Sequence, residues 1–345
     1  MSRERPGMGE GMGEFELIAR YFTRPVRRAA LGVGDDCALL LPAAGMQLAV
    51  SSDMLVAGRH FFADVAPHRL GHKALAVNLS DLAACGARPL AFTLALALPR
   101  IDEPWLEGFA RGLLALADAH GCELVGGDTT QGPLNICITV FGEVPAGQAL
   151  LRSNARPGDD IYVSGNLGDA RLALLALQGQ LALPAERLER ARQRLEQPAP
   201  RLALGQALRG IASSAVDISD GLLGDLGHIL QASGVGARID TRSTMGLIAE
   251  SAYETCATCA GSPLDPELIQ QCTLAGGDDY ELAFTAAPAL RAAVAAAAQA
   301  SATPVTRIGL VQARPGLRLV DAQGQPVRQR YASFDHFASP ASAPS

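Results

Sequence analysis

Aspartates recur beside glycines or hydroxyl residues at five places in the chain, each after an apolar stretch that could form a buried strand. The segments are GVGDD with Asp35 and Asp36, SSDML with Asp53, GGDTT with Asp128, DISDG with Asp217 and Asp220, and GGDDYE with Asp278 and Asp279. A single Gly-Asp pair is typical of a turn, because both residues tolerate turn geometry. Five such segments at strand ends are expected to meet at one rim of a sheet. Their oxygens favour a hard divalent cation, and Mg²⁺ best where phosphates share the coordination.

A sixth acid, Asp81, lies in a segment of helical periodicity rather than in a turn. It falls four residues after Val77 and shares a stripe with Leu70 and Ala74, so we expect its carboxylate to point toward the protein. A carboxylate on a buried helix face needs a partner, and few Lys or Arg residues are close in the sequence. Hydroxyl residues beside the acids can add ligands or donors, namely Ser51, Ser52, Thr129, Thr130 and Ser219.

Other common phosphate and catalytic motifs are absent from the sequence. It contains no G-x-x-x-x-G-K-[ST] loop, no kinase glycine-rich loop with its downstream residues, and no G-x-S-x-G elbow. The lack of His/Cys clusters argues against zinc. Cys256 and Cys259 form a C-x-x-C that no second pair completes, and we favour an incidental helix-face pair over a metal or redox site.

Two basic residues leave alternatives open. His60 follows the Ser51–Asp53 segment closely and could reach the same site, or it could be a hydrogen-bonded surface imidazole. Arg152 is isolated among apolar and turn residues, where it could bind a phosphate with its two-pronged guanidinium or form a structural salt bridge.

The composition is that of a globular protein with a substantial core. The 345 residues are 48% apolar and 19% charged, with a net charge of -6. The acidic balance argues weakly against nucleic-acid or membrane-surface binding, and no apolar run approaches the length of a membrane span. The N-terminus lacks the apolar region of a secretory signal, so we predict a cytoplasmic protein, with Met1 or Met12 as the start.

Strands and helices alternate in both halves, which predicts an α/β or α+β protein of two domains. Pro157-Gly158-Asp159 is turn chemistry between two apolar blocks. We predict a disordered tail over 1–13, an N-terminal domain over 14–148, a C-terminal domain over 149–337 and a disordered tail over 338–345. The patterns predict helices over 14–22, 68–85, 102–121 and 185–197, and strands over 46–55, 90–98, 134–144, 161–165 and 281–285. The first of these strands has its polar end at Ser51, Ser52 and Asp53, and we expect a short strand from Cys122 to be followed by a glycine turn at GGDTT.

An ordered set of segments resembles the thiamine-monophosphate kinase family, of the superfamily that includes aminoimidazole ribonucleotide synthetase and selenophosphate synthetase. The segments are LGVGDDCALL, VSSDMLVAGRHF, KALAVNLSDLAACGARP, LVGGDTT, ALLRSNARPGD, DISDGLLGDLGHI, GGDDYEL and a terminal FDHF. The resemblance runs from about Gly13 to Phe337, and VAGRHF, GGDTT and FDHF make it specific within the superfamily.

The resemblance implies an aminoimidazole ribonucleotide synthetase-like fold, whose N-terminal sheet pairs across a homodimer. It also implies direct in-line transfer of the ATP γ-phosphoryl group to thiamine phosphate, with several Mg²⁺ ions, as the last step of thiamine diphosphate biosynthesis. The acceptor is already an anion, so no general base is needed, and the barrier is mainly charge repulsion and alignment. We therefore expect no phosphoenzyme.

The resemblance also assigns roles to residues of this chain. Metal ligands fall on Asp36, Ser51, Ser52, Asp53, Asp81, Asp128, Asp217 and Asp220, of which Asp36, Asp53, Asp81 and Asp128 are the predicted catalytic residues. Gly127, Asp128, Arg152 and Ser219 match ATP-contacting positions, and His60, Asp278 and Phe334 match positions that contact thiamine phosphate. Of the first pair of acids, we expect Asp36 to bind metal and Asp35 to brace the turn.

Three residues depart from the family pattern. Asp278 replaces a longer Glu, so its reach to the substrate differs. Met54 stands where a Thr is common and lacks its hydroxyl, and Phe334 can stack on a pyrimidine but cannot donate a hydrogen bond.

Two other functions stay open. One is another ATP-dependent synthetase of the superfamily, acting on a purine intermediate or a selenium donor, although no reactive Cys stands near a glycine-rich N-terminal segment. The other is a non-catalytic nucleotide-binding dimer that regulates a partner, which would have little use for so many metal ligands.

Overall fold

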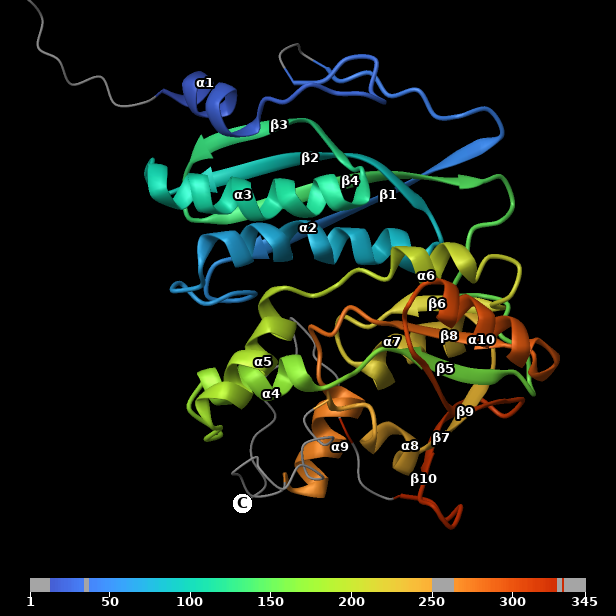
Figure 1. Ribbon diagram of the computed structural model, residues 1–345. Helices are drawn as coiled ribbons and strands as arrows, with labels where there is room; N and C mark the ends of the chain where they lie inside the picture. Colours follow the sequence, from blue (N-terminus) through green and yellow to red (C-terminus); the bar gives the residue numbers. More distant parts are fainter. Residues whose placement is uncertain (1–12, 34–36, 250–263, 328–330, 332–345) are drawn as a thin grey trace, which may run out of the picture. The chain divides into compact units, whose positions relative to one another are not determined.

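The computed structural model describes residues 13–33, 37–249, 264–327 and 331 (Figure 1). These residues form two sheets flanked by helices, which confirms the predicted mixed α/β class. Several predictions lie outside the described residues: the two disordered tails (apart from Gly13), Asp35, Asp36, Cys256, Cys259 and Phe334.

The first sheet has four strands in the order β1-β4-β2-β3. They are β1 (Met46–Val56), β2 (Arg88–Leu98), β3 (Glu123–Gln131) and β4 (Asn135–Pro145). Strands β2 and β3 are parallel, and their register shifts between Phe92 and Thr93. Strands β1 and β3 are therefore the two edges of this sheet, and both carry predicted site residues.

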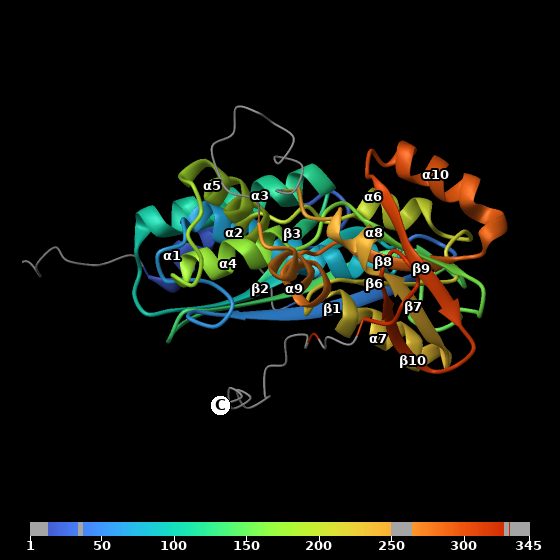
Figure 2. The same cartoon turned by 90° about the horizontal axis from the view of Figure 1, so that it is seen from below.

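Four helical segments accompany the first sheet: α1 (Glu14–Leu17), a π-helical turn η1 (Ile18–Phe22), α2 (Pro67–Ala84) and α3 (Glu103–His120). Figure 2 shows α2 and α3 on one side of strands β1 and β2. Helix α3 begins where predicted, because the Asp102 side chain accepts a hydrogen bond from the Trp105 amide at 3.2 Å. It ends at Gly121, which has the left-handed conformation that favours glycine.

Two glycines let α2 and α3 approach closely. A Cβ atom on Gly71 of α2 would lie 2.1 Å from the Phe109 carbonyl oxygen, and one on Gly112 of α3 would lie 1.8 Å from the His68 carbonyl oxygen. Both distances are far below van der Waals contact. Glycine at these positions therefore fixes how α2, the helix that carries Asp81, packs against α3.

The second sheet has six strands in the order β10-β7-β9-β5-β8-β6, all antiparallel except the β7–β10 pair. They are β5 (Asp160–Ser164), β6 (Ser214–Asp217), β7 (Gly236–Asp240), β8 (Leu282–Ala286), β9 (Val305–Gln312) and β10 (Gly316–Val320). Strands β5, β6 and β8 are buried along their whole length, including the polar residues Asp160, Ser164, Ser214 and Asp217.

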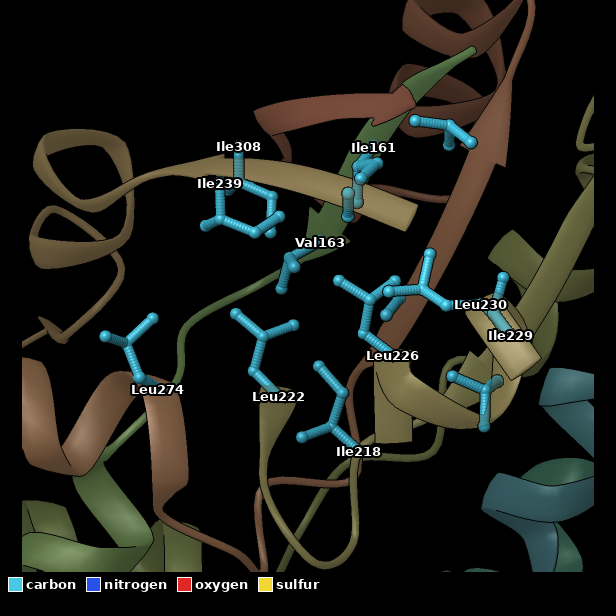
Figure 3. Packing of buried hydrophobic residues seen from close by; sticks show 14 of the residues in the cluster. Ile161, Val163, Ile218, Leu222, Leu226, Ile229, Leu230, Ile239, Leu274 and Ile308 are labelled. Atoms are coloured by element: carbon cyan, nitrogen blue, oxygen red, sulfur yellow. The ribbon is translucent and has the colours of Figure 1, made fainter. Parts of the chain in front are cut away.

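The helices of this part are α4 (Asp169–Leu177), α5 (Ala185–Glu196), α6 (Leu202–Ala207), α7 (Leu222–Ser233), α8 (Thr241–Met245), α9 (Pro266–Ala275), the 3-10 turn η3 (Pro288–Leu290) and α10 (Arg291–Ala300). Figure 3 shows Leu222 and Leu226 of α7 packed near Ile161 and Val163 of β5 in the main core cluster. This packing fixes the turn between β6 and α7, which follows Asp217 and contains Asp220.

The strand predicted over 46–55 is confirmed as β1, which ends at Val56 and contains Ser51, Ser52 and Asp53. The glycine turn expected at GGDTT is wrong, because these residues lie within β3. The physical reason is that β3 is an edge strand, paired on one side only, where polar side chains stay partly hydrated.

The described residues form two compact units: those of 1–42, 52–75 and 90–141, and those of 43–51, 76–89 and 142–345. This division cuts across β1, α2, β2 and β4, so it follows no single point of the chain. The boundary predicted near residue 149 stays a prediction. Among the helices of the described ranges, none is both long and apolar enough to cross a membrane.

Candidate active site

Asp81 is half-buried on α2 and accepts a hydrogen bond from Ser51 of β1. The Ser51 Oγ to Asp81 Oδ2 distance is 2.5 Å. Burial raises the pKa of Asp81, while the Ser51 hydrogen bond and the positive charge of Arg152 act in the opposite direction. The predicted inward orientation is confirmed. A carboxylate that burial penalises in this way gains from a bound cation.

Asp217 lies beside the same part of α2. It is 6% exposed at the end of β6, and Ser80 Oγ donates to its Oδ2 at 2.8 Å. Burial raises the pKa of the Cys85 thiol, one helical turn after Asp81, and the charges of Asp81 and Asp217 raise it further. Two acids from distant sequence segments, Asp81 and Asp217, therefore lie along one stretch of α2.

The DISDG and GGDDYE segments are joined by backbone hydrogen bonds. The Asp278 amide donates to the Ser219 carbonyl and the Tyr280 amide to the Ile218 carbonyl, both at 2.8 Å. A Cβ on Gly277 would lie 2.4 Å from the Ser219 carbonyl oxygen, so the two turns are in close contact. The structure thus places Asp278 directly beside Ser219 and Asp220.

The second of these turns is strained. Asp278 and Tyr280 have φ angles of 65° and 52°, in the left-handed region that disfavours residues with side chains. Such strain persists only where the surrounding structure holds it, and it is concentrated at functional sites.

Two buried carboxylates of GGDDYE, Asp279 and Glu281, hold the strained turn, although the sequence grouped Asp279 with the cation-binding acids and gave Glu281 no role. Both oxygens of Asp279 accept the Gly168 amide, at 3.0 and 3.1 Å, and burial raises the pKa of Asp279. Glu281 accepts from Ser164 Oγ at 2.6 Å, and Arg194 and Arg201 pair with it. The only feature of the sequence that could have indicated these two roles is a run of acids directly before an unbroken apolar strand.

His60 and Ser52 lie at or near β1. The Val56 amide donates to His60 Nδ1 at 3.0 Å, so the half-buried imidazole closes the turn after β1. Ser52 Oγ donates to the Ile138 carbonyl of β4 at 3.1 Å. Asp53 is half-buried on the opposite face of β1 from Ser52, the face that also carries Ser51.

Gly127 and Asp128 form part of the wall of a pocket of about 670 Å³. Its other walls come from α1 and η1 (Phe15, Ile18, Phe22), from β2 (Thr93, Leu94), from Val33 and Ala38, and from further residues of β3. Gly127 has a φ of 147°, and a Cβ there would lie 1.9 Å from the Leu94 carbonyl oxygen, so only glycine fits. Asp128 is exposed at this pocket.

The structure does not bring all predicted ligands together. Asp53 on β1 and Asp128 on β3 lie at opposite edges of the sheet, with two strands of about 4.8 Å spacing between them. Within the described ranges, no three His, Cys, Asp or Glu residues are close enough to hold a metal ion. Arg152 is exposed and forms no ion pair with any described residue, although its charge lowers the pKa of Asp81. Its role in binding phosphate stays a prediction.

The fold and the site define a protein of the AIR synthase related class. The model of its N-terminal domain matches residues 34–144, and that of its C-terminal domain matches residues 156–322.

Closer relatives identify the family within that class. The chain is 47% identical over 334 residues to a thiamine-monophosphate kinase of Salmonella typhimurium, covering 95% of this chain and 99% of the relative. The crystal structure of thiamine-monophosphate kinase from Stenotrophomonas maltophilia K279a superposes with a TM-score of 0.77 at 45% identity, covering 91% of this chain and 96% of that one. AaThiL complexed with AMPPCP and TMP superposes with a TM-score of 0.70 at 28% identity, covering 86% of this chain and 89% of that one. The chain belongs to the thiamine-monophosphate kinase family, which confirms the resemblance and the fold class predicted from the sequence.

Proposed function

We propose that this enzyme transfers the γ-phosphoryl group of ATP to the phosphate of thiamine phosphate, giving thiamine diphosphate in the last step of its biosynthesis. The observation that carries the proposal is the junction of two turns: the Asp278 amide donates to the Ser219 carbonyl. This junction places a residue matched to thiamine phosphate beside one matched to ATP. A related structure that holds both AMPPCP and TMP supports the same pair of substrates.

The donor set of the site fits Mg²⁺. It consists of carboxylates and hydroxyls, and burial penalises the Asp81 anion. We propose Asp36, Ser51, Ser52, Asp53, Asp81, Asp128, Asp217 and Asp220 as the residues that hold several Mg²⁺ ions. Bound Mg²⁺ would supply neutralisation of the negative charge on the two phosphates.

The residues of this chain contribute positioning rather than a nucleophile or a base. We propose that Gly127, Arg152 and Ser219 bind the phosphates of ATP, and that His60, Asp278 and Phe334 hold thiamine phosphate. Since the acceptor oxygen is already anionic, alignment of the two phosphates is the main requirement. Direct in-line transfer without a phosphoenzyme follows, and it predicts inversion at a chiral γ-phosphate.

The nucleoside end of ATP fits the pocket beside Gly127 and Asp128. Ile18 is half-buried in its wall, whereas the next residue, Ala19, is exposed and does not line it. We predict that Ile18→Trp fills the pocket and raises KM for ATP at least about tenfold, corresponding to about 1.4 kcal/mol, with KM for thiamine phosphate unchanged. Ala19→Trp is the matched control, and an unchanged KM for ATP in Ile18→Trp would exclude this location.

We further propose a cytoplasmic homodimer that pairs through the four-stranded sheet. Strand β1 is an edge strand, and Leu48, Val50 and Met54 on one of its faces are 46%, 58% and 54% exposed. An exposed apolar row on an edge strand is a surface that proteins normally cover. We also propose that the chain divides into two domains at residue 149.

The test is incubation of the purified protein with Mg-ATP and thiamine phosphate. The proposal predicts thiamine diphosphate and ADP in equal amounts. Asp128→Ala is expected to abolish turnover in a folded protein, because it removes an exposed carboxylate without opening a core cavity. Glu107→Ala, an exposed acid on α3, is the control that should keep full activity.

Absence of product would favour the non-catalytic regulatory alternative. A synthetase acting on a purine intermediate or a selenium donor is the weaker candidate, since relatives near 47% identity over almost the whole chain are kinases by name.

A further inference from the structure

Asp225 holds the turn between β6 and α7 by its backbone. It lies in the first turn of α7 and is 4% exposed. Its Oδ2 atom accepts hydrogen bonds from three successive amides, those of Ser219 at 3.0 Å, Asp220 at 3.0 Å and Gly221 at 3.1 Å. Successive amides that converge on one point form a nest, a concave site for an anion. Here the anion is a side chain of the protein itself.

The amides held by Asp225 belong to Ser219 and Asp220, which are two of the residues proposed for the site, and to Gly221. The side chains of Ser219 and Asp220 project from the same three-residue turn, and the Ser219 carbonyl accepts the amide of Asp278. The position of Asp225 therefore determines the position of a proposed ATP contact, a proposed metal ligand and the substrate-side turn at once.

The turn has little room for another backbone path. Gly221 has a φ of 118°, and a Cβ there would lie 2.9 Å from the Ala275 carbonyl carbon at the end of α9. Gly277 of the same neighbouring segment contacts the Ser219 carbonyl, where a Cβ would lie at 2.4 Å. The turn is therefore closely packed, and the three hydrogen bonds to Asp225 hold its amides in one orientation.

We propose that Asp225 is a positioning residue for phosphoryl transfer: it fixes the Ser219–Gly221 turn, so that Ser219 and Asp220 meet the ATP phosphates and Mg²⁺ in the required geometry. This inference rests on the proposed function. Asp225 acts through the three amides and contacts no substrate. Outer-shell groups of this kind typically change metal affinity or activity by 10 to 100-fold.

A purely structural role for Asp225 would be that of a helix cap, which contributes to stability alone. Asp240 provides a matched control, because it caps α8 by accepting the Arg242 amide at 2.9 Å and carries no proposed function. Both Asp225→Ala and Asp240→Ala should lower the melting temperature. Only the former should change the site.

The experiment measures kcat, the Mg²⁺ concentration for half-maximal rate, and Mg²⁺-dependent binding of AMPPCP by calorimetry. For Asp225→Ala we expect kcat to fall about a hundredfold and AMPPCP binding to weaken about tenfold, with Asp240→Ala unchanged in both. Asp225→Asn keeps one oxygen as acceptor and should recover part of both losses. Wild-type kcat, Mg²⁺ requirement and AMPPCP binding in folded Asp225→Ala would overturn the proposal.

If Asp225→Ala does not fold, Asp225→Glu decides the question. It keeps the negative charge but moves the oxygens by one methylene, so a positioning role predicts a lower kcat and a higher Mg²⁺ requirement, whereas wild-type values would overturn it. Failure of the wild-type protein to form thiamine diphosphate would reject the proposed function instead, and AMPPCP binding would still test the role of Asp225.

Discussion

At the scale of single residues, Asp278 combines a rigid backbone with a shortened side chain. Its φ of 65° and the 2.8 Å bond from its amide to the Ser219 carbonyl fix where the side chain begins. The family commonly has a Glu at this place. The backbone cannot compensate for the missing methylene, so the reach of the carboxylate toward thiamine phosphate depends on side-chain length alone.

We predict that Asp278→Glu lowers KM for thiamine phosphate about threefold or more and leaves KM for ATP unchanged. An extra charge-assisted hydrogen bond of ordinary strength accounts for a change of this size. Steady-state kinetics with each substrate varied in turn measures it. Asp278→Asn is the companion variant and should raise KM for thiamine phosphate, whereas equal KM values in all three proteins would show that residue 278 does not contact this substrate.

The sequence was informative about residues whose role depends on local periodicity. The inward orientation of Asp81 follows from its place on the α2 stripe, and the Ser51 contact confirms it. The roles of Asp225, Asp279 and Glu281 were not predictable. Asp279 and Glu281 bind groups far away in the sequence, such as the Gly168 amide, 111 residues from Asp279. The Asp225 bonds are local, but they need the positive-φ turn at Gly221, which no spacing rule specifies.

At the scale of elements, the predicted helices and strands agree with the structure within one or two residues, but the end of β3 was not predicted. The start of α3 at Asp102 and its end at Gly121 depend on capping chemistry within one turn of the chain. The end of β3 depends on its partner strand β2, about thirty residues earlier. Pairing with another segment overrode the local preference of Gly and Asp for turns.

The contact between α2 and α3 gives a prediction about stability. Alanine normally favours a helix over glycine by about 1 kcal/mol. At Gly71, however, a Cβ would lie 2.1 Å from the Phe109 carbonyl oxygen, so Gly71→Ala should destabilise the protein by about 1 to 3 kcal/mol.

Gly227 in α7 is the matched control for Gly71, because a Cβ there meets nothing within 4 Å. Gly227→Ala should stabilise the protein by about 0.5 to 1 kcal/mol. Urea unfolding of the two variants measures both changes, and the same sign for both would contradict the close packing of α2 on α3.

At the scale of the whole molecule, the four-stranded sheet carries proposed site residues on both edges and an exposed apolar row on β1. One chain leaves Asp53 and Asp128 apart, on opposite edges. A sheet that pairs with a second copy would cover the apolar row of Leu48, Val50 and Met54. The strand predicted over 46–55 contains all three residues, but the sequence alone could not show that it is an edge strand.

We predict that the protein sediments as a dimer and that Val50→Glu shifts it to the mass of one chain. A buried unpaired carboxylate is strongly unfavourable in an interface, and Val50 is 58% exposed in the single chain, so the substitution leaves the fold of that chain intact. Ala63→Glu, in the exposed loop after β1, is the control and should remain dimeric. A monomeric wild type, or a Val50→Glu dimer of unchanged affinity, would contradict pairing through this face.

Direct transfer of the γ-phosphoryl group from ATP to thiamine phosphate, at a site built from the joined acidic turns, can be followed with a label. The experiment uses ATP with a radiolabelled γ-phosphate, Mg²⁺ and unlabelled thiamine phosphate. We predict that the label appears in the terminal phosphate of thiamine diphosphate, with none bound to the protein. Label found only in inorganic phosphate, with no labelled thiamine diphosphate, would contradict it.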